Sequence, residues 1–320
     1  MSHAATIAAL WRACPVVLAP MEDVTDAVFR RLIRTVGAEL CVTEFVRAEQ
    51  IIAATKVARR KATLAADDRP TAIQIYGADA GLLMEAAEVA AAAAPAYVDV
   101  NCGCWVPRVA RGGAGAGWLR NPTAMVAMAG QVVRAVGLPV TVKTRIGWGP
   151  ESDMPIVDLA RRLEDVGVAG LTIHCRTAQQ GYTGGADWAW ARRAREVVAM
   201  PVVVNGDITS ADHAAQALAE TGCTAVMIGR AAISYPWVIR EALAWLRDGR
   251  RLAPATPAER RALYQAILDA NVAARGPVFG VRVTRRHIPM LQPLLTEADR
   301  RALYVAPTVD EALALVDRAA

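Results

Sequence analysis

Several short apolar segments of this sequence end in residues that could hold a ligand or take part in a reaction. Lys143 offers an ammonium group, Gln74 offers an amide, and Cys104 places a thiol directly after its segment. His174 is predicted to be a ligand contact, the alternative being a core histidine bonded to its neighbours. A purely structural framework would have little use for so many polar segment ends, so they indicate a functional site. The residues concerned are Pro20, Met21, Glu44, Gln74, Asn101, Cys104, Lys143, Arg145, His174, Arg176, Asn205, Gly206, Asp207, Gly229 and Arg230.

The last two of these segments end in Asn-Gly-Asp (205–207) and Gly-Arg (229–230). Glycines expose backbone N–H groups and arginine binds phosphate oxygens through paired hydrogen bonds, so the two loops predict a phosphate site. Ordinary turn glycines with a surface arginine are the alternative. A phosphate site with Gln74 and Lys143 deeper inside suits flavin mononucleotide (FMN). Gln74 would bond the edge of the isoalloxazine ring, and Lys143 would neutralise charge near N1 and O2 of the reduced ring.

The segments that must position these residues are rich in β-branched residues and apolar on both faces, which is typical of buried parallel strands. A helical pattern follows each one. Eight such units in about 230 residues predict an α/β fold, a (β/α)8 TIM barrel, whose active sites form at the carboxyl ends of the strands. A doubly wound sheet is the alternative. The predicted strands are VVLAP (16–20), LCVTEF (40–45), TAIQIYG (71–77), YVDVNCG (97–103), PVTVKTR (139–145), GLTIHCR (170–176), PVVVNGD (201–207) and AVMIGR (225–230).

The pattern changes after residue 250, where a Pro/Ala-rich linker begins and no further strand is predicted. Thr256 to Glu259 and Thr308 to Glu311 have the spacing of capping boxes, which predict helix starts. Earlier in the chain, Asn121 is predicted to cap one helix, and a second helix is predicted over residues 153–165. We therefore expect a barrel domain over residues 1–250 and a small helical domain over residues 251–320. The helical part carries about three of the chain's net +5 charges.

The composition is that of a globular protein. The 320 residues are 54% hydrophobic and 21% charged, which excludes a disordered or fibrous chain. A net charge of +5 permits an anionic partner without requiring one. Of 36 basic residues only Lys56, Lys61 and Lys143 are lysines, so a lysine at a buried strand end suggests a need for a compact ammonium group.

Cysteine usage and the absence of targeting signals favour the cytoplasm. Six cysteines are too sparse for a disulfide framework. The N-terminus has no basic region or convincing cleavage site, and charged residues and a proline interrupt the most apolar stretch, so neither a signal peptide nor a membrane span is predicted. The pair Cys102 and Cys104 lacks zinc-site spacing and a second ligand pair, so no metal is expected. The glycine-rich stretch 112–117 lacks a P-loop lysine and is expected to form a flexible rim.

The chain resembles the tRNA-dihydrouridine synthases. The matching motifs occur in the same order as in that family and cover almost the whole predicted barrel. VRVTRRHIPML (281–291) also looks like part of the family's RNA-binding helical domain. The tail is closest to the branch that acts on uridine 17, whereas Asn-Cys-Gly-Cys is more like the branch that acts on uridine 16, so the target uridine stays open. The matching segments are LAPMEDVTD (18–26), TEF (43–45), IQIYG (73–77), DVNCGC (99–104), GAGAGWLRNP (113–122), VKTRIGW (142–148), IHCRTAQQGYTG (173–184), VVNGDI (203–208) and VMIGRAA (226–232).

The resemblance implies reduction of the uracil 5,6 double bond in tRNA, with FMN as cofactor and NADPH as electron source. Hydride would pass from flavin N5 to C6, and the Cys104 thiol, mostly protonated at neutral pH, would protonate C5. The implied FMN contacts are Pro20, Met21, Gln74, Lys143, His174, Asn205, Gly206, Asp207, Gly229 and Arg230. The implied RNA contacts are Asn101, Arg145 and Arg176 in the barrel and Arg282, Arg285 and Arg286 in the tail.

One position departs from the family pattern, because Trp105 follows the catalytic cysteine where the family usually has proline. Trp105 could stack on an RNA base or fill the space of the missing proline, and the second is favoured. Two other functions remain open. A free-pyrimidine or dihydroorotate-type flavoenzyme would not need the basic tail, and an RNA-binding protein or chaperone of the same fold would have impaired catalysis. The protein is expected to be a monomer.

Overall fold

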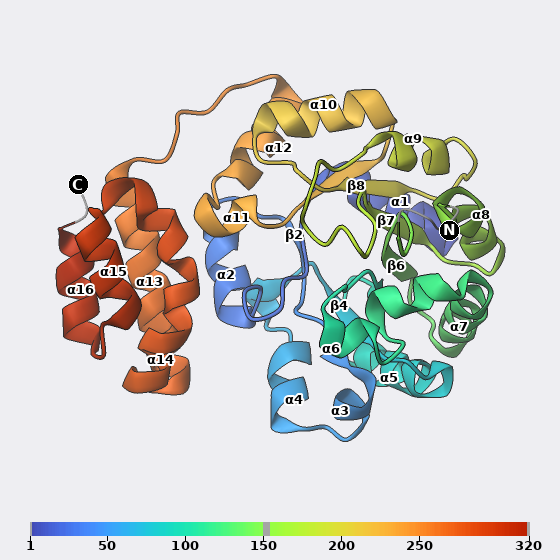
Figure 1. Cartoon of the computed structure of the whole chain (residues 1–320), viewed down its shortest axis with the longest axis horizontal. Coiled ribbons are helices and arrows are strands. Elements are labelled where there is room, and N and C mark those ends of the chain that lie inside the picture. The colour runs from blue at the N-terminus through green and yellow to red at the C-terminus, as the bar shows by residue number, and fades with distance from the viewer. Residues whose placement is uncertain (1, 150–153, 319–320) are drawn as a thin grey trace.

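The computed structural model describes residues 2–149 and 154–318, and within them eight parallel strands close into a barrel surrounded by helices (Figure 1). Strand β9 pairs with β1, and β2 pairs with β4, so the sheet returns on itself. The predicted (β/α)8 TIM barrel is confirmed, and each predicted segment supplies one strand. The strands are β1 (Val16–Leu18), β2 (Leu40–Val42), β4 (Thr71–Tyr76), β5 (Val98–Cys102), β6 (Val140–Arg145), β7 (Gly170–His174), β8 (Val202–Asn205) and β9 (Ala225–Ile228), with a short additional strand β3 (Val46–Arg47) beside β4.

Helices cover the outside of the barrel, as its apolar outward-facing strand residues require. Asn121 caps its helix as predicted, its Oδ1 accepting from the backbone N–H of Ala124 at 3.1 Å. The helix predicted over 153–165 is observed from Ile156 to Asp165, and residue 153 lies outside the described residues. The helices are α2 (Ala27–Thr35), α3 (Ala48–Ile52), α4 (Lys56–Ala62), η1 (Ala66–Asp68), α5 (Ala80–Ala92), α6 (Pro107–Ala110), η2 (Gly115–Arg120), α7 (Pro122–Ala135), α8 (Ile156–Asp165), α9 (Ala189–Arg195), α10 (Ala211–Thr221), α11 (Ala231–Ser234) and α12 (Val238–Asp248).

An N-terminal helix, α1 (His3–Ala13), covers the amino end of the barrel. Its Ile7 and Trp11 are buried, and the Trp11 ring meets Tyr97 edge-on with centroids 6.1 Å apart. Gly170 at the start of β7 leaves room for this helix, because a Cβ there would lie 2.6 Å from the Trp11 ring. The apolar start of the chain is thus part of the core. The amino end of the barrel is closed, and the carboxyl ends of the strands are left for a site.

The C-terminal helices pack together at one side of the barrel, next to α2 and α11 (Figure 1). Thr256 and Glu259 form the predicted capping box, and Thr308 caps the last helix. His287 stacks on the buried Phe29 of α2, with ring centroids 4.6 Å apart. The tail thus extends the hydrophobic core of the barrel. Its elements are α13 (Pro257–Arg275), α14 (Pro277–Thr284), η3 (Arg285–Leu294), α15 (Glu297–Val305) and α16 (Val309–Asp317).

The glycine-rich stretch 112–117 is not the flexible rim that the sequence predicts. Its second half begins the buried helix η2 against the Cys104 loop. Gly115 has a φ of +56°, and a Cβ there would lie 2.8 Å from the carbonyl oxygen of Cys104. A Cβ at Gly117 would lie 2.7 Å from the oxygen of Ala110. The glycines therefore permit close packing of two backbones behind the thiol. Elsewhere, among the described residues, no helix is both long and apolar enough to cross a membrane.

Candidate active site

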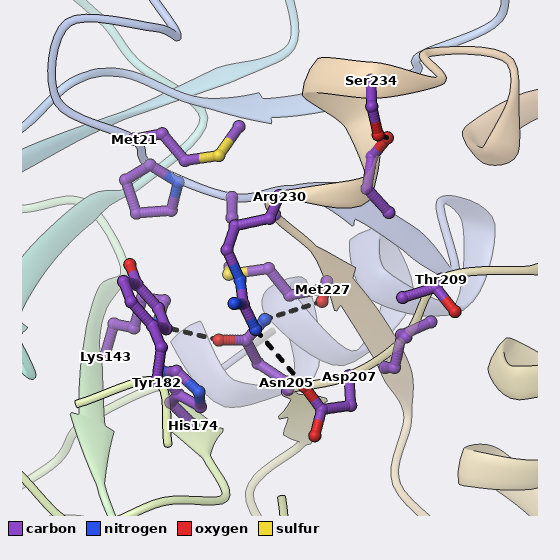
Figure 2. Close-up of a pocket in the computed structure, with 16 residues that line it drawn as sticks. Met21, Lys143, His174, Tyr182, Asn205, Asp207, Thr209, Met227, Arg230 and Ser234 are labelled. Atoms are coloured by element: carbon purple, nitrogen blue, oxygen red, sulfur yellow. Dashed lines mark hydrogen bonds and ion pairs between the residues drawn. The ribbon is translucent and has the colours of Figure 1, made fainter. Parts of the chain in front are cut away.

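A cavity of about 400 Å³ opens at the carboxyl ends of β1, β6, β7, β8 and β9. It contains nine of the ten residues predicted to contact a cofactor, all except Gln74. Figure 2 shows Lys143 and His174 on one side of it and Arg230 crossing its centre. The sequence-predicted residues that line the cavity are Pro20, Met21, Lys143, His174, Asn205, Gly206, Asp207, Gly229 and Arg230.

The inner end of this cavity holds a cation and a neutral imidazole. Lys143 Nζ donates to Asn205 Oδ1 at 3.2 Å, and Asn205 Nδ2 in turn donates to the carbonyl oxygen of Met227 at 2.8 Å (Figure 2). Burial, reinforced by the positive charge of Arg145, lowers the pKa of Lys143 to about 8. Burial and the neighbouring cations also hold the pKa of His174 far below its ordinary value. His174 is therefore uncharged at neutral pH, and Lys143 is the group that carries charge at this end.

The outer end of the cavity holds a carboxylate between two arginines. Asp207 accepts from Arg176 Nη2 at 2.6 Å and from the backbone N–H of Ala186 at 2.8 Å, and it lies 3.3 Å from Arg230 Nη2. Partial burial opposes ionisation, but these hydrogen bonds and positive charges hold the pKa of Asp207 below its usual range. Arg230 is 53% exposed and retains unused donors toward the cavity.

A second cavity of about 320 Å³ adjoins the first and contains Cys104. The structure describes all six cysteines as free, and Cys104 is half-buried. Burial raises the pKa of its thiol above the ordinary value. The thiol is therefore protonated at neutral pH, which is the form that has a proton to give. The residues that line both cavities are Pro20, Met21, Lys143, His174, Tyr182 and Arg230.

Tyr182, which the sequence reasoning did not single out, stands where the two cavities meet. Its ring lies 6.2 Å from the His174 ring, and the Arg230 guanidinium lies 4.4 Å from its centroid. Trp105 meets Tyr182 edge-on at 5.8 Å and packs 3.2 Å from where a Cβ of Gly181 would be. Trp105 therefore fills space against the loop that carries Tyr182, and it also lines the second cavity. The motif around Tyr182 was visible in the sequence, but its loop has no periodicity that predicts where the ring lies.

Four other barrel residues were predicted to contact FMN or RNA. Two of them line the second cavity, and the other two line neither cavity. Asn101 lines the second cavity, as does Arg145, whose Nη1 donates to the carbonyl oxygens of Thr177 and Gly181. Arg176 lines neither cavity and is occupied by Asp207 and by backbone carbonyls. Gln74 is fully buried beneath both cavities. The structure thus brings Asn101 and Arg145 to the Cys104 side and places Arg176 and Gln74 in the supporting layer.

The three predicted tail arginines also have different surroundings. Arg282 is exposed on α14, and Arg286 is half-buried at the start of η3. Arg285 donates to the carbonyl oxygen of Ala306 at 2.9 Å and holds two tail segments together. Arg282 and Arg286 are therefore the better placed of the three to meet an external anion.

One group of carboxylates lies close enough together to hold a cation. Within the described residues this group is Glu22, Asp23 and Glu44. Lys61 Nζ lies 2.6 Å from Glu22 and 3.7 Å from Glu44, and the backbone N–H of Asp23 donates to Glu44 at 2.8 Å. An internal ammonium group thus already pairs with two of these three carboxylates.

The fold and these two cavities define a class of protein: a TIM barrel with a helical C-terminal extension and a thiol beside a nucleotide-sized cavity at its strand ends. The family model described as "Dihydrouridine synthase (Dus)" matches residues 17–302. The chain belongs to the dihydrouridine synthase family.

Curated relatives match along most of their length. A "Probable tRNA-dihydrouridine synthase" from Rhodobacter capsulatus is 37% identical over 275 residues, which cover 86% of this chain and 85% of the relative. The "tRNA-dihydrouridine synthase B" of Shewanella oneidensis is 36% identical over 272 residues, covering 85% of this chain and 84% of the relative. The "Probable tRNA-dihydrouridine synthase 1" of Synechocystis sp. is 34% identical over 307 residues, covering 95% of this chain and 86% of the relative.

Proposed function

We propose that this chain reduces the 5,6 double bond of a uridine in tRNA to give dihydrouridine, with FMN in the first cavity and NADPH as the source of electrons. The observation that carries the proposal is the shared wall between the two cavities. Lys143, His174 and Tyr182 line both, so a base in the second cavity would lie between Cys104 and a flavin in the first. The family membership and the names of the curated relatives support the substrate.

The residues of the first cavity fit FMN. Pro20, Met21 and Met227 supply apolar walls for a flat ring system, and Arg230 and Ser234 supply donors for a phosphate. Gly206 has a φ of +120°, and a Cβ there would lie 2.8 Å from Ala186, so only glycine allows this close backbone turn. Among the described residues that line the cavity, Asp207 is the one carboxylate, and Arg176 and Arg230 compensate its charge.

Bound FMN would supply a hydride to C6 of the uracil. The chain's part of the reaction is to hold the base and to protonate C5, and the protonated Cys104 thiol is suited to that transfer. Lys143 would neutralise the negative charge near N1 and O2 of the reduced ring before the hydride is transferred. Asn101 and Arg145 would bond the uracil edge from the second cavity.

The substrate base must leave its stack to enter the barrel, and single-stranded loops of RNA allow this at low cost. We propose that residues 251–320 act as the RNA-binding domain and residues 1–250 as the catalytic domain. The exposed Arg282 and the neighbouring Arg286 would contact phosphates and select which uridine arrives.

The direct test uses purified full-length protein and tRNA that lacks dihydrouridine. We expect the protein to carry the visible absorption of a flavin and, with NADPH, to add two hydrogens to one uridine, as measured by mass spectrometry of RNA fragments. Colourless protein that binds tRNA would support the RNA-binding alternative. Turnover of free pyrimidines but not tRNA would support the small-molecule alternative.

A further inference from the structure

A chain of hydrogen bonds runs from the Cys104 loop into the interior of the barrel. The backbone N–H groups of Gly103 and Cys104 donate to Asn101 Oδ1 at 3.1 and 2.9 Å. Asn101 Nδ2 donates to Gln74 Oε1 at 2.8 Å, and Gln74 Nε2 donates to Asp99 Oδ2 at 2.6 Å. The hydroxyl of Thr141 donates to the other oxygen of Asp99 at 2.5 Å. Three adjacent strands, β4, β5 and β6, thus contribute to one continuous polar path.

The direction of every bond in this chain is fixed from both ends. Backbone N–H groups can only donate, so the oxygen of the Asn101 amide must face the loop and its nitrogen must face Gln74. The Gln74 oxygen must then face Asn101, which leaves its nitrogen to face position 99. An ionised carboxylate only accepts hydrogen bonds, so it is the residue type that ends the chain correctly.

The side chains of the chain are enclosed. Gln74 is 0% exposed, Asp99 is 3% exposed and Asn101 is 6% exposed. Buried amides and carboxylates destabilise a protein unless their hydrogen bonds are made, so this arrangement is strongly preferred over any with a reversed amide. On its other side the loop is held by the backbone N–H of Ala116, which donates to the carbonyl oxygen of Cys104 at 3.0 Å.

We propose that Gln74 and Asp99 are positioning residues, which fix the orientation of the Asn101 amide and, through it, the loop that presents the Cys104 thiol. The inference deepens the proposed function, since it concerns the placement of the proposed proton donor. It assigns Gln74 a role on the thiol side of the site, because Gln74 bonds Asn101, which lines the same cavity as Cys104.

The test removes the hydrogen bond between the side chains at positions 74 and 99 and then restores it with its direction reversed. In Gln74→Glu, the new carboxylate still accepts from Asn101 but meets the buried carboxylate of Asp99, so the pair either carries a second negative charge or binds a proton that the wild-type pair does not need. In the double variant Gln74→Glu/Asp99→Asn, the introduced amide donates to the introduced carboxylate and its oxygen accepts from Thr141, so every bond is made again. Asp99→Asn alone keeps an acceptor for Gln74 and serves as the conservative variant. Gln74→Met, which adds no charge and can make neither bond, is measured beside Gln74→Glu and stands in for it if that protein does not fold.

Two measurements are made on flavin-loaded protein: kcat and KM with tRNA, and the pH dependence of Cys104 alkylation by iodoacetamide, followed by mass spectrometry. We expect Gln74→Glu to lose about 10²-fold in kcat with little change in KM, as a misplaced reacting group does. The alkylation midpoint should shift in the same variant. The double variant should recover most of the wild-type kcat and most of the wild-type alkylation midpoint. Asp99→Asn should stay close to wild type in both measurements. Thr221→Val, which removes a buried hydroxyl bonded to Ala217 in α10, is the matched control and should change neither.

The proposal is overturned if Gln74→Glu and Gln74→Met both behave as wild type, or if the double variant is no better than an impaired Gln74→Glu. Loss of activity that follows loss of flavin, without rescue, would also overturn it and would assign Gln74 to the cofactor alone. Where Gln74→Met stands in for Gln74→Glu, wild-type kcat and alkylation in Gln74→Met would overturn it. Wild-type protein that forms no dihydrouridine would count against the proposed function instead, and the alkylation data would still decide the positioning role.

Discussion

At the scale of single residues, the site contains two groups whose protonation is shifted by burial. Cys104 keeps its proton to higher pH than an ordinary thiol, and Lys143 loses its proton near pH 8. An acid and a cation of this kind on one wall suit the simultaneous delivery of a proton and stabilisation of negative charge. Both groups are in the required form at neutral pH.

Replacing Cys104 with alanine should abolish proton delivery while leaving the cavities intact. We expect Cys104→Ala to retain flavin absorption and tRNA affinity and to lose about 10²- to 10⁴-fold in turnover, the usual contribution of a general acid. Dihydrouridine formation in single-turnover reactions measures this. Wild-type rates in the variant would refute the assignment, and Cys14→Ala, at a half-buried thiol remote from both cavities, is the control.

The pH dependence of turnover should report Lys143. The ammonium group is charged below its pKa of about 8 and neutral above it, so kcat should fall as the pH rises through about 8. In Lys143→Arg the guanidinium stays charged, and the fall should move to the higher pH at which Cys104 ionises. Rates measured across neutral and alkaline pH test this. An unchanged profile in Lys143→Arg would show that another group controls the rate.

At the scale of elements, the strands and their terminal residues could be predicted from the sequence, because apolar β-branched segments identify buried strands. The position of Asn205 at the end of β8 follows directly from that pattern. The interior contacts could not be predicted in the same way. Asp99 and Gln74 belong to strands β5 and β4, and their contact depends on the registration of neighbouring strands in the closed barrel. Tyr182 lies in a loop whose path is set by Arg145 and Trp105 rather than by a local pattern.

The close packing of the segment behind Cys104 depends on Gly115. We expect Gly115→Ala to lower the free energy of unfolding by about 1–3 kcal/mol, because a Cβ at positive φ would also overlap the Cys104 carbonyl. Turnover should fall further than the loss of folded protein explains, since the thiol moves with its backbone. Denaturant unfolding and turnover are measured together. Gly112→Ala, whose nearest contact would be 3.6 Å away, should resemble wild type in both.

At the scale of the whole molecule, the barrel and the C-terminal helices form one continuous core. Arg275 of α13 is ion-paired with Asp26 at the start of α2, and Phe29 lies under His287. The helical tail, the capping box at Thr256 and the helix start at Thr308 were predictable from the sequence. Its docking against α2 was not, because the contact joins segments from opposite ends of the chain and has no local signature.

The tail arginines should act through charge. We expect Arg282→Gln and Arg286→Gln each to weaken tRNA binding and to reduce the salt dependence of the affinity by about one phosphate contact. Binding isotherms at several salt concentrations measure both. Arg162→Gln on the barrel helix α8, where the arginine pairs with Asp158, is the control and should leave the slope unchanged. Equal effects from all three variants would argue for a diffuse attraction instead of contacts in the tail.

The stacking of His287 on Phe29 has a consequence for synthesis of the chain. Helix α2 emerges from the ribosome long before the tail residues that cover it. Until then Phe29 lacks its stacking partner, and exposed apolar groups are sites of aggregation and chaperone binding in nascent proteins. Synthesis of the tail therefore completes the packing of α2 as well as adding new helices.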